Sequence, residues 1–451
     1  MLTRRHFIQR TGAALTGSAL LSALSRAGYA QTPPADYKAL VCLFLNGGND
    51  GNNLLIPVDD EGYAQYEAVR GSSSGINISQ ESWLPIMSAS QGGRNFGLHP
   101  SLKGLKGLYD SGRAGLLCNV GTLQQPLTRV QYRAGQGRPP NLFSHLDQVL
   151  QWQAGSGGSV ARPSGWGGRL ADANGSRFNG ETSFPMLASL SGVNLFTTGL
   201  AAGVIAPGSS SLRGFGTSAA SKSRYEALRK IESLDDGRSA LIQAKNRITG
   251  AAIDNLSVLN SALDSLPALS TVFPTSSLGQ QLQTVARMIA LRDVLGLRRQ
   301  IFYCSLGGFD THANQLSTQA SLLATLDAAL SAFHAATVEL DVEQAVTSFT
   351  LSDFGRTFKP SAGGGSDHGW GSHHLLVGGA VNGGDLYGRY PSLIPGGDDD
   401  ADSEGRWIPT TSVDEYGAQL ARWFGAGDLS ALFPNIGNFD ASRTDLGFMA
   451  S

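Results

Sequence analysis

The stretch "ALVCLFLNGGND" at residues 39–50 decides the fold of this chain. Its first seven residues are all apolar and lack the alternation of polar and apolar positions that a half-exposed strand shows. A short apolar run of this kind, ended by a glycine pair, is typical of a strand that is buried on both faces of a parallel sheet. The stretch therefore predicts a sheet that is covered by helices on both sides.

Three more runs of the same kind follow, at residues 114–120, 301–306 and 346–351. Between the runs, apolar residues recur every three or four positions, which predicts helices at residues 276–299, 315–340 and, with many exposed charges, 222–262. Strands that alternate with helices indicate an α/β protein. We expect a three-layer α/β/α sandwich around a mostly parallel sheet, spanning residues 31–451, with Gly/Ser-rich and helical insertions around residues 153–262.

The composition excludes some classes of protein. The 451 residues include 34 Lys and Arg against 36 Asp and Glu, so the formal charge of −2 gives no electrostatic case for a nucleic-acid partner. Cys42, Cys118 and Cys304 all lie inside apolar runs, which is typical of buried free thiols and not of a disulfide framework.

Residues 1–30 are predicted to be a targeting segment. Arg4 and Arg5 precede a weakly apolar stretch that closes with small residues at Gly28 and Ala30, as in a twin-arginine (Tat) export signal. The alternative is an ordinary secretory signal with a chance pair of arginines. We expect a periplasmic or extracellular protein that meets the Tat translocase during export. No later run is expected to span a bilayer, so no stable membrane anchor is predicted.

Acidic residues follow three of the predicted strands. Asp50 follows the first, Asp310 and His312 follow the run at 301–306, and Asp353 follows the run at 346–351. Ligands of open α/β sheets bind at the carboxyl ends of strands, where these acids would converge. A turn cap is the alternative role for any single Asp, but three acids with an adjacent histidine favour a metal site.

The stretch "GGGSDHGWGSHHLLVGG" at residues 363–379 predicts a glycine-rich loop before an apolar run, and it carries His368, His373 and His374, three of the eight histidines. Histidine with carboxylate is a ligand set for zinc, manganese or iron. We expect one or two of these histidines to bind a divalent metal, for which zinc, manganese and calcium are the candidates. The acidic run at 396–406 resembles a calcium loop only in part, and we expect a solvated loop there.

A candidate nucleophile, Ser144, lies in "PPNLFSHLDQVLQWQ" at residues 139–153, where a helix is predicted to begin after two prolines. A helix N-terminus stabilises an anion and lowers the pKa of a hydroxyl group that a metal holds. The alternative is that Ser144 is only the N-cap of this helix. The adjacent His145 is a candidate ligand or acid/base group.

Six motifs together resemble the Tat-exported family catalogued as domain of unknown function 1501. They are "LNGGNDGNNLLIPVDDEGYAQYEAVRG", "FGLHPSLKGLKGLYDSGRAGLLCNVGT", "LFSHLDQVLQWQ", "GGFDTHANQ", "LSDFGRTFKPSAGGGSDHGWGSHHLLVGGAVNGGDLYGRY" and "WIPTTSVDEYGAQLARWFG". The family is similar, more distantly, to the alkaline phosphatase/sulfatase superfamily. This resemblance implies an alkaline phosphatase-like sandwich with a metal-assisted nucleophile that acts on phosphate or sulfate esters.

The resemblance also implies roles for single residues. It implies that the metal ligands are Asp50, Asp310, His312 and Asp353, and that the nucleophile is Ser144. It also implies that the last histidine ligand is His368, His373 or His374. The chain departs from the resembled superfamily at Phe354, where many members have His or Asn, so we expect one of two metal positions to be altered or absent. No Cys lies in a C-x-P-x-R context, which excludes the formylglycine mechanism of sulfatases.

The expected function is an exported metal-dependent hydrolase of phosphate or sulfate esters, with a small-molecule or glycan ester as substrate. Arg356 is expected either to contact substrate oxygens or to form a structural ion pair. One alternative is an inactive, metal-containing protein that binds a surface glycan or a protein partner. Another is a metal-free serine hydrolase, which needs a histidine within hydrogen-bond reach of Ser144.

Overall fold

The computed structural model describes residues 36–71, 75–155, 163–206, 218–233, 239–440 and 445–450. The predicted export signal at 1–30 lies outside the described residues. So do parts of the two Gly/Ser-rich segments, at 156–162 and 207–217.

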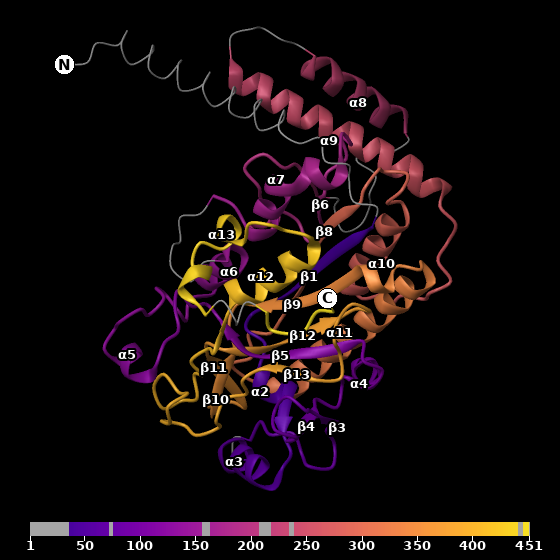
Figure 1. Ribbon diagram of the computed structural model, residues 1–451. Coiled ribbons are helices and arrows are strands. Elements are labelled where there is room, and N and C mark those ends of the chain that lie inside the picture. Colours follow the sequence, from indigo (N-terminus) through magenta and orange to yellow (C-terminus); the bar gives the residue numbers. More distant parts are fainter. Residues whose placement is uncertain are drawn as a thin grey trace, which may run out of the picture.

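A large central sheet organises the described part of the chain (Figure 1). Its nine strands there are, along the sheet, β13 (Leu386–Gly388), β5 (Ala114–Gly121), β12 (Ser372–Val377), β9 (Val346–Ser352), β1 (Lys38–Asn46), β8 (Arg299–Gly307), β6 (Leu187–Ser189) and β7 (Val204–Ile205), with β14 (Thr411–Ser412) beside β5. β1 lies between β8 and β9 and is parallel to both. Only β12 runs antiparallel to its neighbours in this described sheet. The mostly parallel α/β fold is therefore confirmed.

The helices cover the sheet on both faces or connect its strands. They are α2 (Gly51–Leu54), α3 (Asp60–Arg70), α4 (Lys103–Asp110), α5 (Arg129–Arg133), α6 (His145–Ala154), α7 (Trp166–Asn179), α8 (Ala219–Glu232), α9 (Ala240–Ser265), α10 (Ser277–Ala290), α11 (Gln315–Glu339), α12 (Val413–Phe424) and α13 (Leu429–Leu432), with short 3₁₀ helices at Glu343–Ala345 and Ile436–Asn438.

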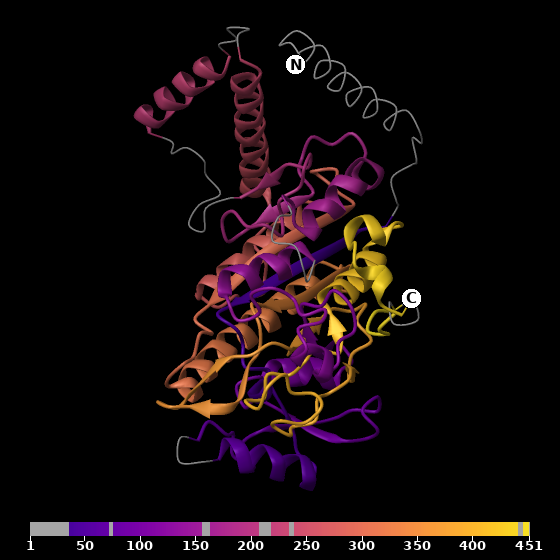
Figure 2. The same cartoon turned by 90° about the vertical axis from the view of Figure 1, so that its left-hand side faces the viewer.

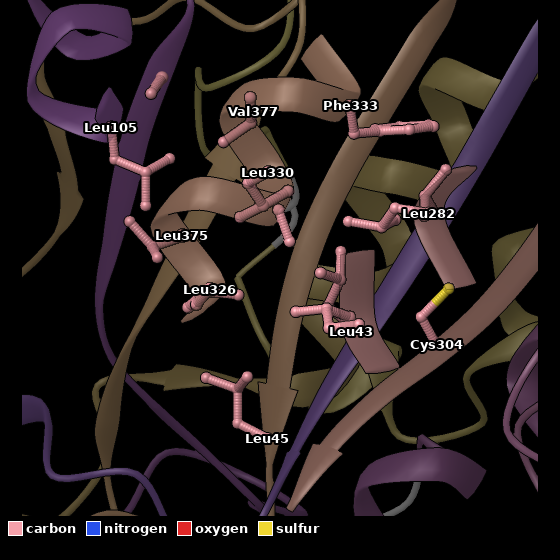
Figure 3. Close-up of a cluster of buried hydrophobic side chains, with 14 of the residues drawn as sticks. Leu43, Leu45, Leu105, Leu282, Cys304, Leu326, Leu330, Phe333, Leu375 and Val377 are labelled. Carbon is pink, nitrogen blue, oxygen red and sulfur yellow. The ribbon is translucent and has the colours of Figure 1, made fainter. Parts of the chain in front are cut away.

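Alternate residues of β1 pack into two separate cores. Leu43 and Leu45 lie in the core that α4, α10 and α11 close (Figure 3). Leu40 and Phe44 point the other way, into the core formed with α6, α7 and α12. Because both faces of the strand are covered, every residue from Ala39 to Leu45 is buried, which explains why the strand has no polar alternation. The result is a three-layer sandwich.

Two predicted helices differ from the structure. The helix expected at 276–299 ends at Ala290, and a turn leads into β8, whose first residue is Arg299. The segment 222–262 forms two helices, α8 and α9, and α8 stands away from the sandwich (Figure 2). Only the C-terminal part of α9 reaches the main core, where Leu259 and Leu263 are buried. No residue described in α8 is buried, so its apolar spacing does not come from contact with the main core.

The helix α11 corrects the expectation that no later segment is long enough to span a membrane. Its length and composition are sufficient for a span. In the structure Leu323, Leu326, Leu330 and Phe333 are buried in the core shared with α4 and α10. The packing of a core helix accounts for its apolar character.

Two small sheets complete the described fold. β2 (Leu55–Pro57), β4 (Asn95–Leu98) and β3 (Leu84–Met87) form one of them. β10 (Arg356–Ser361) and β11 (Gly365–His368) form an antiparallel hairpin. Ser366 of this hairpin donates its backbone N–H to Thr311 O, in the loop after β8. The hairpin therefore lies against the carboxyl end of the sheet.

Two further expectations concern burial. The three cysteines are free and buried, as expected. The acidic run at 396–406 is not simply solvated, because Asp400 is fully buried. Its carboxylate accepts backbone N–H groups from Gly396, Gly405 and Arg406. This carboxylate folds the loop around itself, which the sequence pattern did not indicate.

Candidate metal centre

Four side chains converge on one point at the carboxyl edge of the sheet. Asp310 follows β8, and its Oδ1 atom lies 3.0 Å from His312 Nε2, 3.4 Å from His368 Nε2 and 3.5 Å from His145 Nε2. The Nε2 atoms of His312 and His368 are 3.0 Å apart. Ligand atoms of a tetrahedral zinc ion with bonds of about 2.0–2.1 Å lie at roughly this spacing. We call these four residues the Asp310 cluster.

The outer nitrogen atoms of two of these histidines are already held. His145 Nδ1 lies 2.7 Å from Asp353 Oδ2, and His368 Nδ1 lies 2.8 Å from Phe143 O. Each oxygen accepts an Nδ1–H, so Nε2 is the nitrogen of each ring that faces Asp310. A carboxylate or carbonyl behind a histidine is the usual support of a metal ligand. His145 Nε2 is also buried without a hydrogen-bond partner among the described residues, so a metal ion would satisfy it.

A second group of ligand atoms overlaps the first. His312, Asp367 and His368 also come close enough to hold an ion. His312 Nδ1 lies 3.8 Å from Asp367 Oδ1, and Asp367 is itself paired with Arg406 at 3.2 Å. Both groups need His368.

Arg356 is paired with the central carboxylate. Its Nη2 donates to Asp310 Oδ1 at 2.7 Å and to Phe309 O at 3.1 Å. Burial raises the pKa of Asp310, but the hydrogen bond and charge of Arg356 outweigh it, so this pKa is lowered and the carboxylate stays ionised. The Arg356 side chain is 0% exposed. Of the two roles expected for Arg356, the structure has the ion pair.

Burial and an aromatic wall shape the inner side of the cluster. Partial burial lowers the pKa of His368, which keeps the imidazole neutral and able to bind a cation. Phe354 is fully buried and stacks on His368 with ring centroids 4.6 Å apart. It also lies 4.8 Å from the His145 ring. His312 is 48% exposed, so the cluster opens to solvent on its side.

A glycine lets the end of β1 approach this site. Gly47 has a φ of +114°, and a Cβ atom there would lie 2.3 Å from Asp310 N. Its backbone N–H donates to Asp353 Oδ1 at 2.9 Å. A side chain at residue 47 would therefore push apart the loops that carry Asp310 and Asp353.

Asp50 is not part of the cluster, although a metal-binding role was predicted for it. Its carboxylate is buried and accepts hydrogen bonds from Arg70, Gln315 and Asn52. It is the N-cap of α2. Arg70 lies on α3 and neutralises the charge that a cation was expected to neutralise.

Ser144 is the N-cap of α6, which was the alternative to a nucleophile. Its hydroxyl group donates to Asp147 Oδ2 at 2.6 Å. The first residue of the helix, His145, lies in the cluster instead. The sequence left the role of His145 open, and the only signal was its place beside Ser144 at a helix start.

His373 and His374 do not join the cluster either. They lie within β12 and not on a loop, and both are buried. His373 Nδ1 accepts Asn119 N–H at 3.1 Å, and the His374 ring packs 4.8 Å from Trp152. Burial lowers the pKa of each to about 3. They are neutral core residues. Asp353 takes part only by supporting His145.

The sequence model of a family described as "Protein of unknown function (DUF1501)" matches residues 37–399. No curated protein matches the chain. Two solved structures superpose at 10% identity: Ps i-CgsB in complex with k-i-k-neocarrahexaose (92% of this chain, 75% of that one, TM-score 0.32), and the PsFucS1 sulfatase from Pseudoalteromonas sp. (92% and 70%, TM-score 0.33). At these TM-scores the superpositions carry no argument about activity.

Proposed function

This chain belongs to the family described as "Protein of unknown function (DUF1501)", and from its own site we propose that it is an exported, metal-dependent hydrolase of phosphate or sulfate esters. One observation carries the proposal. The Nε2 atoms of His145, His312 and His368 surround the ionised carboxylate of Asp310, and the outer nitrogens of His145 and His368 are held by oxygen acceptors. The twin arginines at residues 4 and 5 support export to the periplasm.

Each residue of the site has a separate task in this proposal. His145, Asp310 and His368, with His312 at the open side, would hold a divalent ion, and three imidazoles with one carboxylate favour zinc. Such an ion supplies a Lewis acid that neutralises charge on the ester oxygens and lowers the pKa of a water molecule. Asp353 and Phe143 O orient two of the rings, and Phe354 keeps water from the inner side.

The attacking oxygen is assigned to water and not to Ser144. The Ser144 hydroxyl group already donates to Asp147 and caps α6. The open side of the cluster, at His312, is where an ester group and a water molecule have access. A small-molecule or glycan ester therefore meets the site from the direction of His312 and Asp367.

The test is hydrolysis of aryl phosphates and aryl sulfates by the mature chain, before and after removal of metal with a chelator. We expect chelation to abolish hydrolysis and zinc or manganese to restore it.

His368→Gln is expected to lose at least about 100-fold in kcat/KM. His334→Gln, on α11, is the matched control and is expected to keep its rate. Ser144→Ala is expected to keep the rate as well, with about 1 kcal/mol less stability. Hydrolysis that survives chelation would contradict the proposal.

A second function is favoured by one observation, the packing of Phe354 against His368 and His145. An apolar ring that closes one side of the cluster suits a metal-containing protein that binds a surface glycan or a protein partner without catalysis. Stoichiometric metal, together with no hydrolysis of either ester class and calorimetric binding of a glycan, would select this function.

A further inference from the structure

We propose that the site takes one divalent ion and not two, and that the guanidinium group of Arg356 stands beside Asp310 where a second cation would be. The inference rests on the metal site of the proposed function and adds to it the number of ions. It concerns the residues of this chain and does not depend on which ester is the substrate.

The two possible ligand groups share one atom. One group is His145, Asp310 and His368, and the other is His312, Asp367 and His368. His368 Nδ1 is bonded to Phe143 O, so only Nε2 is left to bind an ion. A neutral imidazole nitrogen has one lone pair and binds one ion. The two groups are therefore alternatives, because an ion bound by one group uses the nitrogen atom that the other group needs.

Asp50 and Asp353, two other acids near this edge, are fully engaged. Asp50 accepts hydrogen bonds from Arg70 on both of its oxygens. Asp353 accepts Gly47 N–H on Oδ1 and the His145 ring on Oδ2, and its side chain is 3% exposed. A second ion at either carboxylate would have to displace these buried partners, which would leave them unsatisfied.

The charge of Arg356 also opposes the binding of a second ion. Arg356 places a positive charge 2.7 Å from Asp310 Oδ1, the oxygen that faces all three histidines. The guanidinium is also anchored by Phe309 O, and its side chain has no exposure to solvent. A fixed cation at this distance repels a second metal ion and neutralises part of the charge that would attract it. Arg356 thus acts on metal binding through the positive charge that it places beside Asp310.

The deciding experiment counts zinc. The metal-depleted mature chain is titrated with zinc ions, and bound metal is measured by calorimetry and by elemental analysis. We expect one zinc per chain in the wild type and in His334→Gln, and none in His368→Gln, because both groups need His368. Two zinc ions per wild-type chain, or one zinc retained by His368→Gln, would overturn the proposal.

A pair of substitutions tests Arg356. Arg356→Met removes the charge but keeps most of the volume, and is expected to lower the zinc dissociation constant about tenfold because the repulsion is relieved. Arg356→Lys keeps the charge and is expected to bind zinc as the wild type does. Unchanged or weaker binding by a folded Arg356→Met would overturn the role of Arg356. If that variant does not fold, the wild-type count and the His368→Gln result still decide the number of ions.

Hydrolysis is measured separately, so that the two proposals fail in different ways. One zinc per chain without any ester hydrolysis would uphold the single-ion site and overturn the proposed activity. Two zinc ions with hydrolysis would overturn the single-ion site and uphold the activity.

Discussion

At the scale of single residues, Asp353 holds His145 and is expected to control metal binding without being a ligand. Its carboxylate receives the Nδ1–H of His145 and fixes both the tautomer and the direction of that ring. Asp353→Asn keeps an oxygen for Gly47 N–H but presents an NH₂ group to His145. Zinc affinity is expected to fall about 10- to 100-fold while the fold is kept. Calorimetric titration measures this, and Asp147→Asn, which changes a carboxylate on the same helix, is expected to bind zinc normally.

Asp50 and Arg70 form a buried pair whose role is stability. The Arg70 and Asp50 side chains are 0% and 1% exposed. Arg70→Met leaves the Asp50 carboxylate without its counter-charge, and we expect a loss of about 3–5 kcal/mol in the free energy of unfolding. Arg298→Met breaks a half-exposed pair with Asp293 and is expected to cost less than about 1 kcal/mol. Urea denaturation compares the two, and equal losses would contradict a structural role for the Asp50 pair.

The sequence could indicate part of the cluster at this scale. Asp310, His312 and His368 were found because acids at strand ends and histidines in a glycine-rich stretch are visible in one dimension. The role of Asp50 was not visible, because its partner Arg70 lies on another element and meets it only after folding. For His145 the sequence left a ligand and an acid/base role open, because the direction of the first residue of α6 depends on how that helix docks against β9.

At the scale of elements, the β10–β11 hairpin sets the distance between His312 and His368. Gly365 permits its close approach, since a Cβ atom there would lie 2.1 Å from the carbonyl carbon of His312. Gly365→Ala is expected to push the hairpin outward and weaken zinc binding by at least about tenfold. Gly107→Ala is the control, because residue 107 lies on α4 and its Cβ would meet no atom within 4 Å. That change is expected to leave zinc binding unchanged and to stabilise α4 by up to about 1 kcal/mol.

The elements themselves were predicted with uneven success. The runs at 39–45 and 346–351 were located closely, since burial on both faces leaves an apolar run with clear ends. The glycines around His373 and His374 suggested a loop, but these residues form β12 because it pairs with β5 and β9. Such pairing joins distant parts of the chain and is invisible to local composition.

At the scale of the whole molecule, neutral buried histidines make stability depend on pH. In the folded chain His373 and His374 have pKa values of about 3, against 6.5 for an unburied histidine. Below pH 6.5 the unfolded chain binds protons that the folded chain does not, so stability falls as the pH falls toward 3. Each histidine is expected to remove about 1.4 kcal/mol per pH unit in this window. Urea denaturation at pH 7 and pH 5 measures the slope.

A variant separates this effect from other titrating groups. His374→Gln is expected to lose one histidine's share of the pH slope, whatever its stability at pH 7. A free energy of unfolding that stays level between pH 7 and pH 5 would contradict the assignment of neutral, buried imidazoles.

The three-layer α/β fold could be predicted because it follows from alternating strands and helices. The export signal at 1–30 stays a prediction.

The central place of β1 has a consequence for the order in which the chain can be assembled. β1 begins at Lys38, but its two neighbours begin at Arg299 and Val346. At a synthesis rate of about 5–20 residues per second, this strand waits for its partners for roughly tens of seconds. During that time the most apolar segment of the sheet has no native edge to pair with, so it needs protection from other nascent chains. Asp353 directly follows the last neighbour to arrive, and His368 comes later still, so the Asp310 cluster is complete only when synthesis is almost over.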